Sequence, residues 1–115
     1  QFHIIDNKKL SCSLYQRSGD IGLGIPFNIA SYSFLTHILA KHCGLNAHEF
    51  IHFIGDAHIY SNHVTELKKQ LLREPYDFPT LDILNIHENI EDYSLDDIII
   101  KNYKSHEKIN MTMTA

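Results

Sequence analysis

Gln16-Arg17-Ser18-Gly19-Asp20-Ile21-Gly22-Leu23-Gly24-Ile25-Pro26-Phe27-Asn28 is the stretch that decides the fold. The residues before it alternate as in a β-strand, and the residues after it have the periodicity of a helix. We expect Gly19, Gly22 and Gly24 to let the backbone turn sharply and approach a ligand closely. Arg17 carries a planar, permanently charged guanidinium that suits phosphate. The stretch therefore predicts an anion site between a strand and a helix.

Three blocks of the sequence stand out. They are Gln16-Arg17-Ser18-Gly19-Asp20 with Leu23-Gly24-Ile25-Pro26-Phe27-Asn28-Ile29-Ala30-Ser31-Tyr32, then Gly55-Asp56-Ala57-His58-Ile59-Tyr60-Ser61-Asn62-His63, then Arg73-Glu74-Pro75 with Phe78-Pro79. Together these blocks closely resemble thymidylate synthase. The resemblance covers residues 1–115 and corresponds to the C-terminal part of a single synthase domain. It is similar in character to the synthase half of protozoan bifunctional enzymes, which are fused to dihydrofolate reductase.

The elements expected along the chain belong to one α+β domain. Two strands at 2–5 and 10–15, joined by polar residues, predict a hairpin. Apolar residues at three- and four-residue steps predict a helix over 28–43 that stops at Gly44. Further strands are expected at 49–54, 81–84 and 98–103, a second helix at 64–72, and a short turn at 94–97. The resemblance implies the thymidylate synthase fold, a mixed β-sheet packed with helices.

Composition limits the classes of function. The 115 residues are 43% hydrophobic and 21% charged, as in a soluble globular domain, and the formal net charge is −4. A negative chain has no global attraction for nucleic acid, so no nucleic-acid partner is expected. The sequence contains neither an apolar run that would span a membrane nor a signal-peptide pattern. A cytoplasmic location follows as an expectation.

The resemblance implies a site for deoxyuridine monophosphate (dUMP). Arg17 and Ser18 would bind the phosphate, and Gln16 and Arg17 would lie near the catalytic thiol, where a cation favours the thiolate. Asn28 would bind uracil, because its carboxamide offers both a donor and an acceptor. The implied substrate residues are Gln16, Arg17, Ser18, Gly19, Asp20, Asn28, His58, Ile59 and Tyr60.

These residue types also have structural interpretations. Asn28 at a helix start is typical of a cap, and Asp20 is typical of a turn. His58 and Tyr60 flank Ile59 and share a face of an extended chain, as half-buried polar residues often do. The resemblance instead implies that both reach the 3′-hydroxyl of the deoxyribose.

The resemblance also implies a folate site. The co-substrate would be 5,10-methylenetetrahydrofolate, and the Asp20 carboxylate would hold its pterin ring while the Asp20 backbone contacts the pyrimidine. The end of the chain, Thr114-Ala115, would close over the folate, although the family usually has alanine where Thr114 stands. The implied folate residues are Asp20, Leu23, Gly24, Phe27 and Thr114.

The catalytic nucleophile of the family is not found among these residues. In the family it lies in a Pro-Cys-His run just before the position of Gln1, so we expect the chain to begin inside the domain and to be inactive alone. Cys12 and Cys43 are expected to be reduced, small apolar packing residues. The nine histidines are expected to be free surface residues, and no metal site is expected.

The function expected from the resemblance is the reductive methylation of dUMP to thymidylate by a homodimeric enzyme with a sheet at its interface. A cysteine thiolate attacks carbon 6 of dUMP, carbon 5 takes the methylene group, and the folate returns a hydride to give dihydrofolate. Two alternatives remain. One is a deoxycytidylate hydroxymethylase of the same fold, against which Asn28 argues. The other is a non-catalytic nucleotide-binding fragment.

Overall fold

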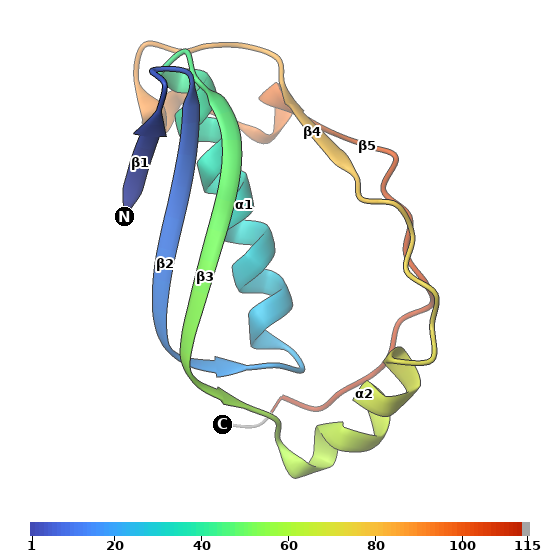
Figure 1. Ribbon diagram of the computed structural model, residues 1–115. Coiled ribbons are helices and arrows are strands. Elements are labelled where there is room, and N and C mark those ends of the chain that lie inside the picture. Colours follow the sequence, from blue (N-terminus) through green and yellow to red (C-terminus); the bar gives the residue numbers. More distant parts are fainter. Residues whose placement is uncertain (114–115) are drawn as a thin grey trace.

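The computed structural model describes residues 1–113 and confirms the α+β class (Figure 1). β1 (Phe2–Ile5) and β2 (Lys9–Asp20) form the predicted hairpin, with antiparallel pairing from Phe2↔Cys12 to Ile5↔Lys9. Its two turn residues, Asp6 and Asn7, have φ values of 51° and 54°. Asp and Asn tolerate this left-handed conformation, and two such residues in succession suit a tight hairpin.

β2 also pairs in parallel with β3 (Asn46–His58), so the sheet is mixed and has the order β1-β2-β3. Parallel neighbours need a crossover, which α1 (Gly24–His42) provides while it packs along one face of the sheet (Figure 1). The pairing runs from Lys9↔Asn46 to Asp20↔His58. Both strands are therefore longer than predicted, and their carboxyl ends reach the same edge of the sheet.

α1 begins at Gly24, four residues before the predicted start at Asn28, and its N-cap is Leu23. Pro26 lies in the first turn, where a missing N–H breaks no hydrogen bond. The predicted stop at Gly44 is confirmed by its φ of +66° and by the hydrogen bond from the Leu45 N–H to the Ala40 carbonyl.

The cysteines differ from the expectation in one respect. Both thiols are free, and Cys12 is buried in β2 as a small apolar residue would be. Cys43 is exposed at the end of α1, so the expectation that it packs in the core is wrong. The reason is that Cys43 is the C-cap residue after α1 and lies in the surface turn at Gly44 that leads the chain into β3.

The second half of the chain forms a separate two-stranded ribbon. β4 (Thr80–Ile83) and β5 (Ile98–Lys101) pair antiparallel, and the turn predicted at 94–97 is the 3-10 helix Leu95–Asp97. A second 3-10 turn, Ile90–Asp92, precedes it. The predicted second helix is α2 (Val64–Gln70), which follows the 3-10 turn Ser61–His63.

A buried carboxylate organises the loop between β4 and β5. Asp97 accepts hydrogen bonds from the side-chain amide of Asn85 at 2.8 Å and from the backbone N–H of Ser94 at 2.9 Å, and His87 Nε2 lies 3.0 Å from it. The Asn85 hydrogen bond, followed by those of Ser94 and His87, holds the pKa of Asp97 well below its usual range. Asp97 therefore stays ionised and ties the loop together at neutral pH.

The two faces of the three-stranded sheet differ. α1 covers one face, where the Tyr32 and Phe50 rings stack with centroids 5.8 Å apart. On the other face the paired residues Tyr15 and Phe53 are 73% and 58% exposed. Adjacent large apolar side chains left open on a sheet mark an interaction surface.

Gly55 is a position in β3 where an added side chain would press against the backbone of β2. A Cβ at Gly55 would lie 2.9 Å from the Arg17 carbonyl oxygen and 2.8 Å from the Tyr15 hydroxyl. Because the carbonyl belongs to the backbone, it cannot move without displacing β2. We expect Gly55→Ala to lower the free energy of unfolding of the full-length protein by about 1–3 kcal/mol, measured by denaturant titration.

The matched control is Gly24→Ala, where a Cβ would come no closer than 3.5 Å to the Asp20 Cβ. This variant should be as stable as the wild-type protein, because 3.5 Å is ordinary van der Waals contact. Equal stability of the Gly55→Ala and Gly24→Ala variants would show that β2 and β3 are not in close contact at Gly55.

Candidate functional site

The parallel ends of β2 and β3 bring together site residues that lie far apart in the sequence. Asp20 and His58 are register partners, and the Ile21 N–H donates to the His58 carbonyl at 2.9 Å. The ring of Tyr60 meets the ring of His58 edge-on, with centroids 5.3 Å apart. Asp20, His58 and Tyr60 thus form one cluster at the edge of the sheet.

A chain of hydrogen bonds connects the sheet to α1 beside this cluster. Gln16 Nε2 donates to Asn28 Oδ1 and to the Ser18 carbonyl, both at 2.9 Å. Gln16 Oε1 accepts from His52 Nε2, also at 2.9 Å, so His52 carries its proton on Nε2. The Asn28 side chain is therefore held in one orientation. Asn28 lies beyond the first residues of α1 and caps nothing, so the cap interpretation is wrong.

The Asp20 carboxylate does close a turn, as its structural interpretation predicts. It accepts from the backbone N–H groups of Gly22 at 2.9 Å and Leu23 at 3.2 Å. Burial raises the pKa of Asp20, but these hydrogen bonds, one from Gly24 and the nearby His63 together lower the pKa below its usual range. Asp20 is therefore an ionised acceptor at neutral pH.

The expectation that Gly19, Gly22 and Gly24 are needed for a sharp turn is wrong, whereas their close approach to a ligand stays a prediction. Among the glycines of the described chain, only Gly44 has a positive φ, so the turn after β2 needs no glycine conformation. At Gly19 and Gly22, neighbouring side chains instead leave no room for a Cβ atom. A Cβ on Gly19 would lie 2.5 Å from Ile25 Cδ1, and a Cβ on Gly22 would lie 2.8 Å from His63 Nδ1. Residues 16–20 are also strand, not loop.

Arg17 lies outside the hydrogen-bonded cluster. Its side chain is exposed, and strand alternation directs it away from the face where Gln16 meets α1. Within residues 1–113, the guanidinium has no described hydrogen bond or ion pair, so it is available to an anion. This places a free cation next to the open sheet face of Tyr15 and Phe53.

The remaining predicted residues lie around the turn and the start of α1. Ser18, Leu23 and Gly24 are half-buried, Ile59 is exposed, and the Phe27 side chain is 74% exposed. Thr114, predicted to close over the folate, lies outside the described residues. The tail before it is docked in part, because Met111 is half-buried while Met113 is exposed.

Two histidines of the site were missed by sequence reasoning, which expected surface histidines. His52 lies between Phe50 and Ile54 on the face of β3 toward α1, so its position in the alternating apolar pattern was a usable signal. His63 is fully buried, at 0% exposure, and its Nε2 contacts the Thr112 carbonyl at 2.7 Å. Nothing in the local sequence distinguishes His63 from the other histidines.

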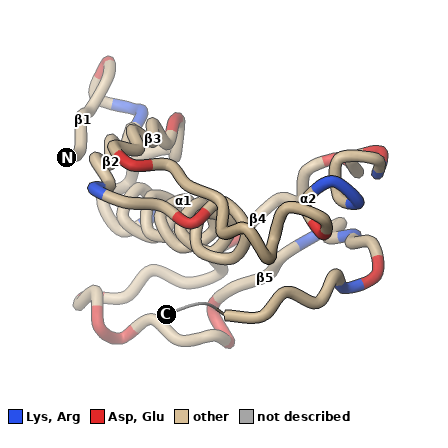
Figure 2. Tube along the Cα trace, turned by 90° about the horizontal axis from the view of Figure 1, so that it is seen from below, with Lys and Arg blue, Asp and Glu red and all other residues tan. Residues whose placement is uncertain are grey.

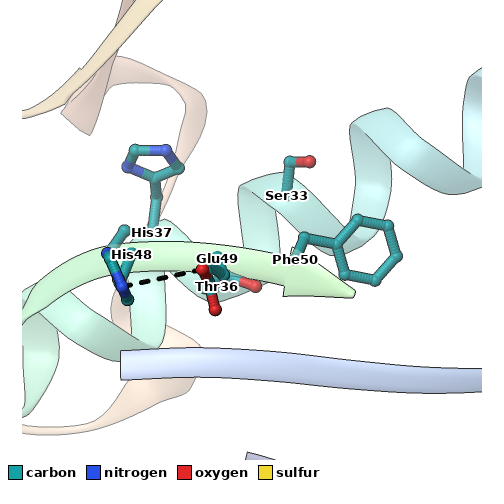
Figure 3. A pocket seen from close by; sticks show the side chains of 7 residues that line it. Ser33, Thr36, His37, His48, Glu49 and Phe50 are labelled. Carbon is teal, nitrogen blue, oxygen red and sulfur yellow. Dashed lines mark ion pairs between the residues drawn. The ribbon is translucent and has the colours of Figure 1, made fainter. Parts of the chain in front are cut away.

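A separate hollow of about 200 Å³ lies between α1 and the start of β3 (Figure 3). It is lined by Ser33, Thr36, His37 and residues 47–50, and the neighbouring side chains of His48 and Glu49 approach with Nε2 3.8 Å from Oε1. It contains none of the predicted site residues. In the part of the chain that the structure describes, no group of three or more potential metal ligands comes together.

Charges and hydrophobicity add two observations. Figure 2 shows Lys and Arg in several separate segments, including α2, and not as one basic surface. None of the helices within residues 1–113 has the length and apolar character needed to cross a bilayer.

An α+β chain with amide, carboxylate, imidazole and phenol groups gathered at the carboxyl ends of parallel strands is typical of an enzyme that binds a polar organic ligand. Comparison with known proteins gives the family. The model of the thymidylate synthase family matches residues 1–115, and the chain belongs to that family.

Similar curated proteins are bifunctional dihydrofolate reductase-thymidylate synthases. The one from Plasmodium berghei is 55% identical over all 115 residues, which cover 19% of its length. The one from Paramecium tetraurelia is 56% identical over 111 residues, or 96% of this chain and 24% of the relative. The chain thus spans about a fifth to a quarter of the length of these relatives.

The lowered pKa of Asp20 leads to a prediction for pH. A carboxyl whose folded pKa is depressed stabilises the turn above its unfolded pKa of about 4, and this stabilisation is lost as pH falls through the lower folded pKa. With selective ¹⁵N labelling of glycine and leucine, the amide proton shifts of Gly22 and Leu23 should stay constant from pH 7 to about pH 4. The Asp20→Asn variant should move both shifts upfield. A titration of these amides with a midpoint above about 4 would contradict the assignment.

Proposed function

We propose that the full-length protein containing residues 1–115 is a thymidylate synthase that methylates dUMP. The observation that carries the proposal is the family match over the whole chain, together with the cluster at the ends of β2 and β3. This chain would contribute most of the dUMP-binding surface and the tail that closes over the folate.

Asn28 would recognise the uracil ring. Its orientation by Gln16 supports this role, because a fixed carboxamide presents a defined donor and acceptor to the uracil carbonyl and ring N–H. The His52–Gln16–Asn28 chain adds a reason for specificity. A neutral, oriented amide discriminates between bases better than a freely rotating side chain.

Near the ends of β2 and β3, His58 and Tyr60 would bind the sugar of dUMP and Arg17 would bind its phosphate. The neighbouring rings of His58 and Tyr60 can both donate to and accept from a 3′-hydroxyl. The exposed, unpaired guanidinium of Arg17 would bind the phosphate with the help of Ser18. The open sheet face beside Arg17, with Tyr15 and Phe53, supports a homodimer in which a second subunit covers this face and completes the phosphate site.

The nucleophile would come from a part of the protein outside residues 1–115. Asn28 and Cys43 are separated by 15 residues, which in a helix is about 22 Å. Cys12 lies four residues before Gln16 in β2, which in a strand is about 13 Å, and it is buried. Neither thiol can reach a ring held by Asn28.

The residues around the Asp20 turn fit a folate. The ionised Asp20 carboxylate accepts hydrogen bonds, which suits the N–H groups of a pterin. The exposed ring of Phe27 and the side chain of Leu23 offer apolar contact. The bound 5,10-methylenetetrahydrofolate would supply both the one-carbon unit and the hydride. Asp20, Leu23, Gly24 and Phe27 would orient it, and the tail with Thr114 would exclude water.

The rest of the protein would cover the apolar side chains that residues 1–115 leave exposed. The side chains of Phe27, Ile29 and Leu35 on α1 are exposed, and such apolar faces must be buried against another element. The names of the relatives support a dihydrofolate reductase domain fused to the synthase domain. A cytoplasmic location remains part of this proposal.

Removal of the guanidinium that is proposed to bind the phosphate tests the role of Arg17. In the full-length enzyme, Arg17→Ala should weaken dUMP binding roughly ten- to hundredfold and slow turnover, because a charged hydrogen bond is worth about 1.5–3 kcal/mol. Binding is measured by calorimetry and turnover by thymidylate formation. Arg17→Lys should be intermediate, since lysine keeps the charge without the planar fork. Unchanged affinity and rate in Arg17→Ala would remove Arg17 from the site.

A charge change at Asn28 tests base recognition. Asn28→Asp should reduce the preference for dUMP over deoxycytidylate by at least about tenfold, because a carboxylate offers no donor to the uracil carbonyl. The ratio of the two dissociation constants is compared with that of Asn46→Asp, which adds the same charge at the start of β3. If the two variants give the same ratio, Asn28 does not read the base. A wild-type preference for deoxycytidylate would favour the hydroxymethylase alternative.

A further inference from the structure

The His63 side chain links the C-terminal tail to the turn after β2. Figure 1 shows the chain after β5 returning past α2 to the lower ends of β2 and β3. There His63 Nε2 lies 2.7 Å from the Thr112 carbonyl oxygen, and His63 Nδ1 lies 3.8 Å from Asp20 Oδ1. One buried ring therefore lies between a backbone group of the tail and the carboxylate that organises the turn.

The chemistry of this contact fixes the role of each ring nitrogen. A carbonyl oxygen only accepts, so Nε2 must carry a proton and donate to Thr112. Nδ1 is buried and has no hydrogen-bond partner within the described residues 1–113, and it faces Asp20. A fully buried imidazole with one nitrogen left unsatisfied is unfavourable for stability alone, which favours a functional reason for its position.

The surroundings of His63 hold its ring in place. The space that a Gly22 side chain would occupy is taken by the ring, since a Cβ there would lie 2.8 Å from Nδ1. The Tyr60 ring meets the His63 ring edge-on, with centroids 5.7 Å apart. His63 is thus in contact with both the Asp20 turn and the predicted sugar-binding residue Tyr60.

The tail approaches His63 along a defined path. Arg73 Nη1 donates to the Glu107 carbonyl at 2.7 Å, and His106 Nε2 donates to the Glu74 carbonyl at 2.8 Å. Residues 106–107 are therefore attached at 73–74, and His63 holds the tail again five residues later at Thr112. Of the tail contacts described, the one with His63 lies nearest to the end of the chain.

We propose that His63 is a positioning residue that holds the C-terminal tail against the Asp20 turn through its hydrogen bond to the Thr112 carbonyl. The inference rests on the proposed function, in which Asp20 and the tail both serve the folate. His63 contacts neither substrate. It acts by keeping the tail close to the turn, so that the two parts of the folate site form together.

The test uses the full-length enzyme and two measurements. Hydrogen exchange of the peptide 104–113, measured by mass spectrometry without substrates, reports the attachment of the tail. Steady-state kinetics report KM for 5,10-methylenetetrahydrofolate and for dUMP separately. In the His63→Asn variant the new side chain is too short to reach the Thr112 carbonyl. In the His63→Gln variant the side-chain amide nitrogen can occupy nearly the position of the imidazole Nε2 and donate to that carbonyl.

We expect His63→Asn to speed exchange of the tail peptide and to raise KM for the folate by at least about fivefold, with KM for dUMP within about twofold of wild type. His63→Gln should stay near wild type in both measurements. Gly22→Ala should behave like His63→Asn, because it displaces an intact His63 ring. The control His3→Gln changes an exposed histidine of β1 and should have no effect.

Unchanged exchange of the tail in His63→Asn would overturn the proposal, as would equal rises in both KM values or equal defects in His63→Gln and His63→Asn. Exchange is measured without substrates, so it tests the contact independently of catalysis. A wild-type enzyme that does not methylate dUMP would instead overturn the proposed function, and with it the assignment of this contact to folate binding.

Discussion

The rest of the structure depends on the parallel pairing of β2 with β3. Parallel strands cannot be joined by a tight turn, so the chain must cross the face of the sheet, and α1 is that crossover. The same pairing brings the carboxyl ends of both strands to one edge. Asp20 from the first strand and His58 from the second become register partners there, although they are 38 positions apart in the sequence.

Polar groups within residues 1–113 orient one another. Gln16 is directed by His52 and in turn directs Asn28, while Asp20 is held by the backbone of its own turn. Each of these side chains is half-buried, where a missing partner would be unfavourable, so the hydrogen bonds restrict rotation as well as satisfy donors and acceptors. Preorganised groups of this kind suit recognition of a small polar ligand.

The large apolar surface that remains open is consistent with a chain that spans a fifth to a quarter of its relatives. Within residues 1–113 the buried apolar residues are few, namely Leu10, Cys12, Ile25, Ala40 and Ile83. Within the described residues, exposed large apolar side chains lie on the outer face of the sheet (Tyr15 and Phe53), on α1 (Phe27, Ile29 and Leu35) and along the second half of the chain, among them Leu71, Leu72, Phe78 and Leu95. Exposed apolar surface of this extent favours contact with another element, which is the physical basis for proposing a second subunit and further chain.

The sequence by itself determined the hairpin, the stop of α1, and the blocks that carry the family resemblance, because these depend on neighbouring residues and on local periodicity. Only the tertiary structure decided why Gly19 and Gly22 are glycines and where His63 lies. Gly22 faces a ring that is 41 positions further along the chain, and His63 meets a carbonyl 49 positions beyond itself. No local pattern encodes such contacts, since they arise only when the strands pair and the tail returns to their ends.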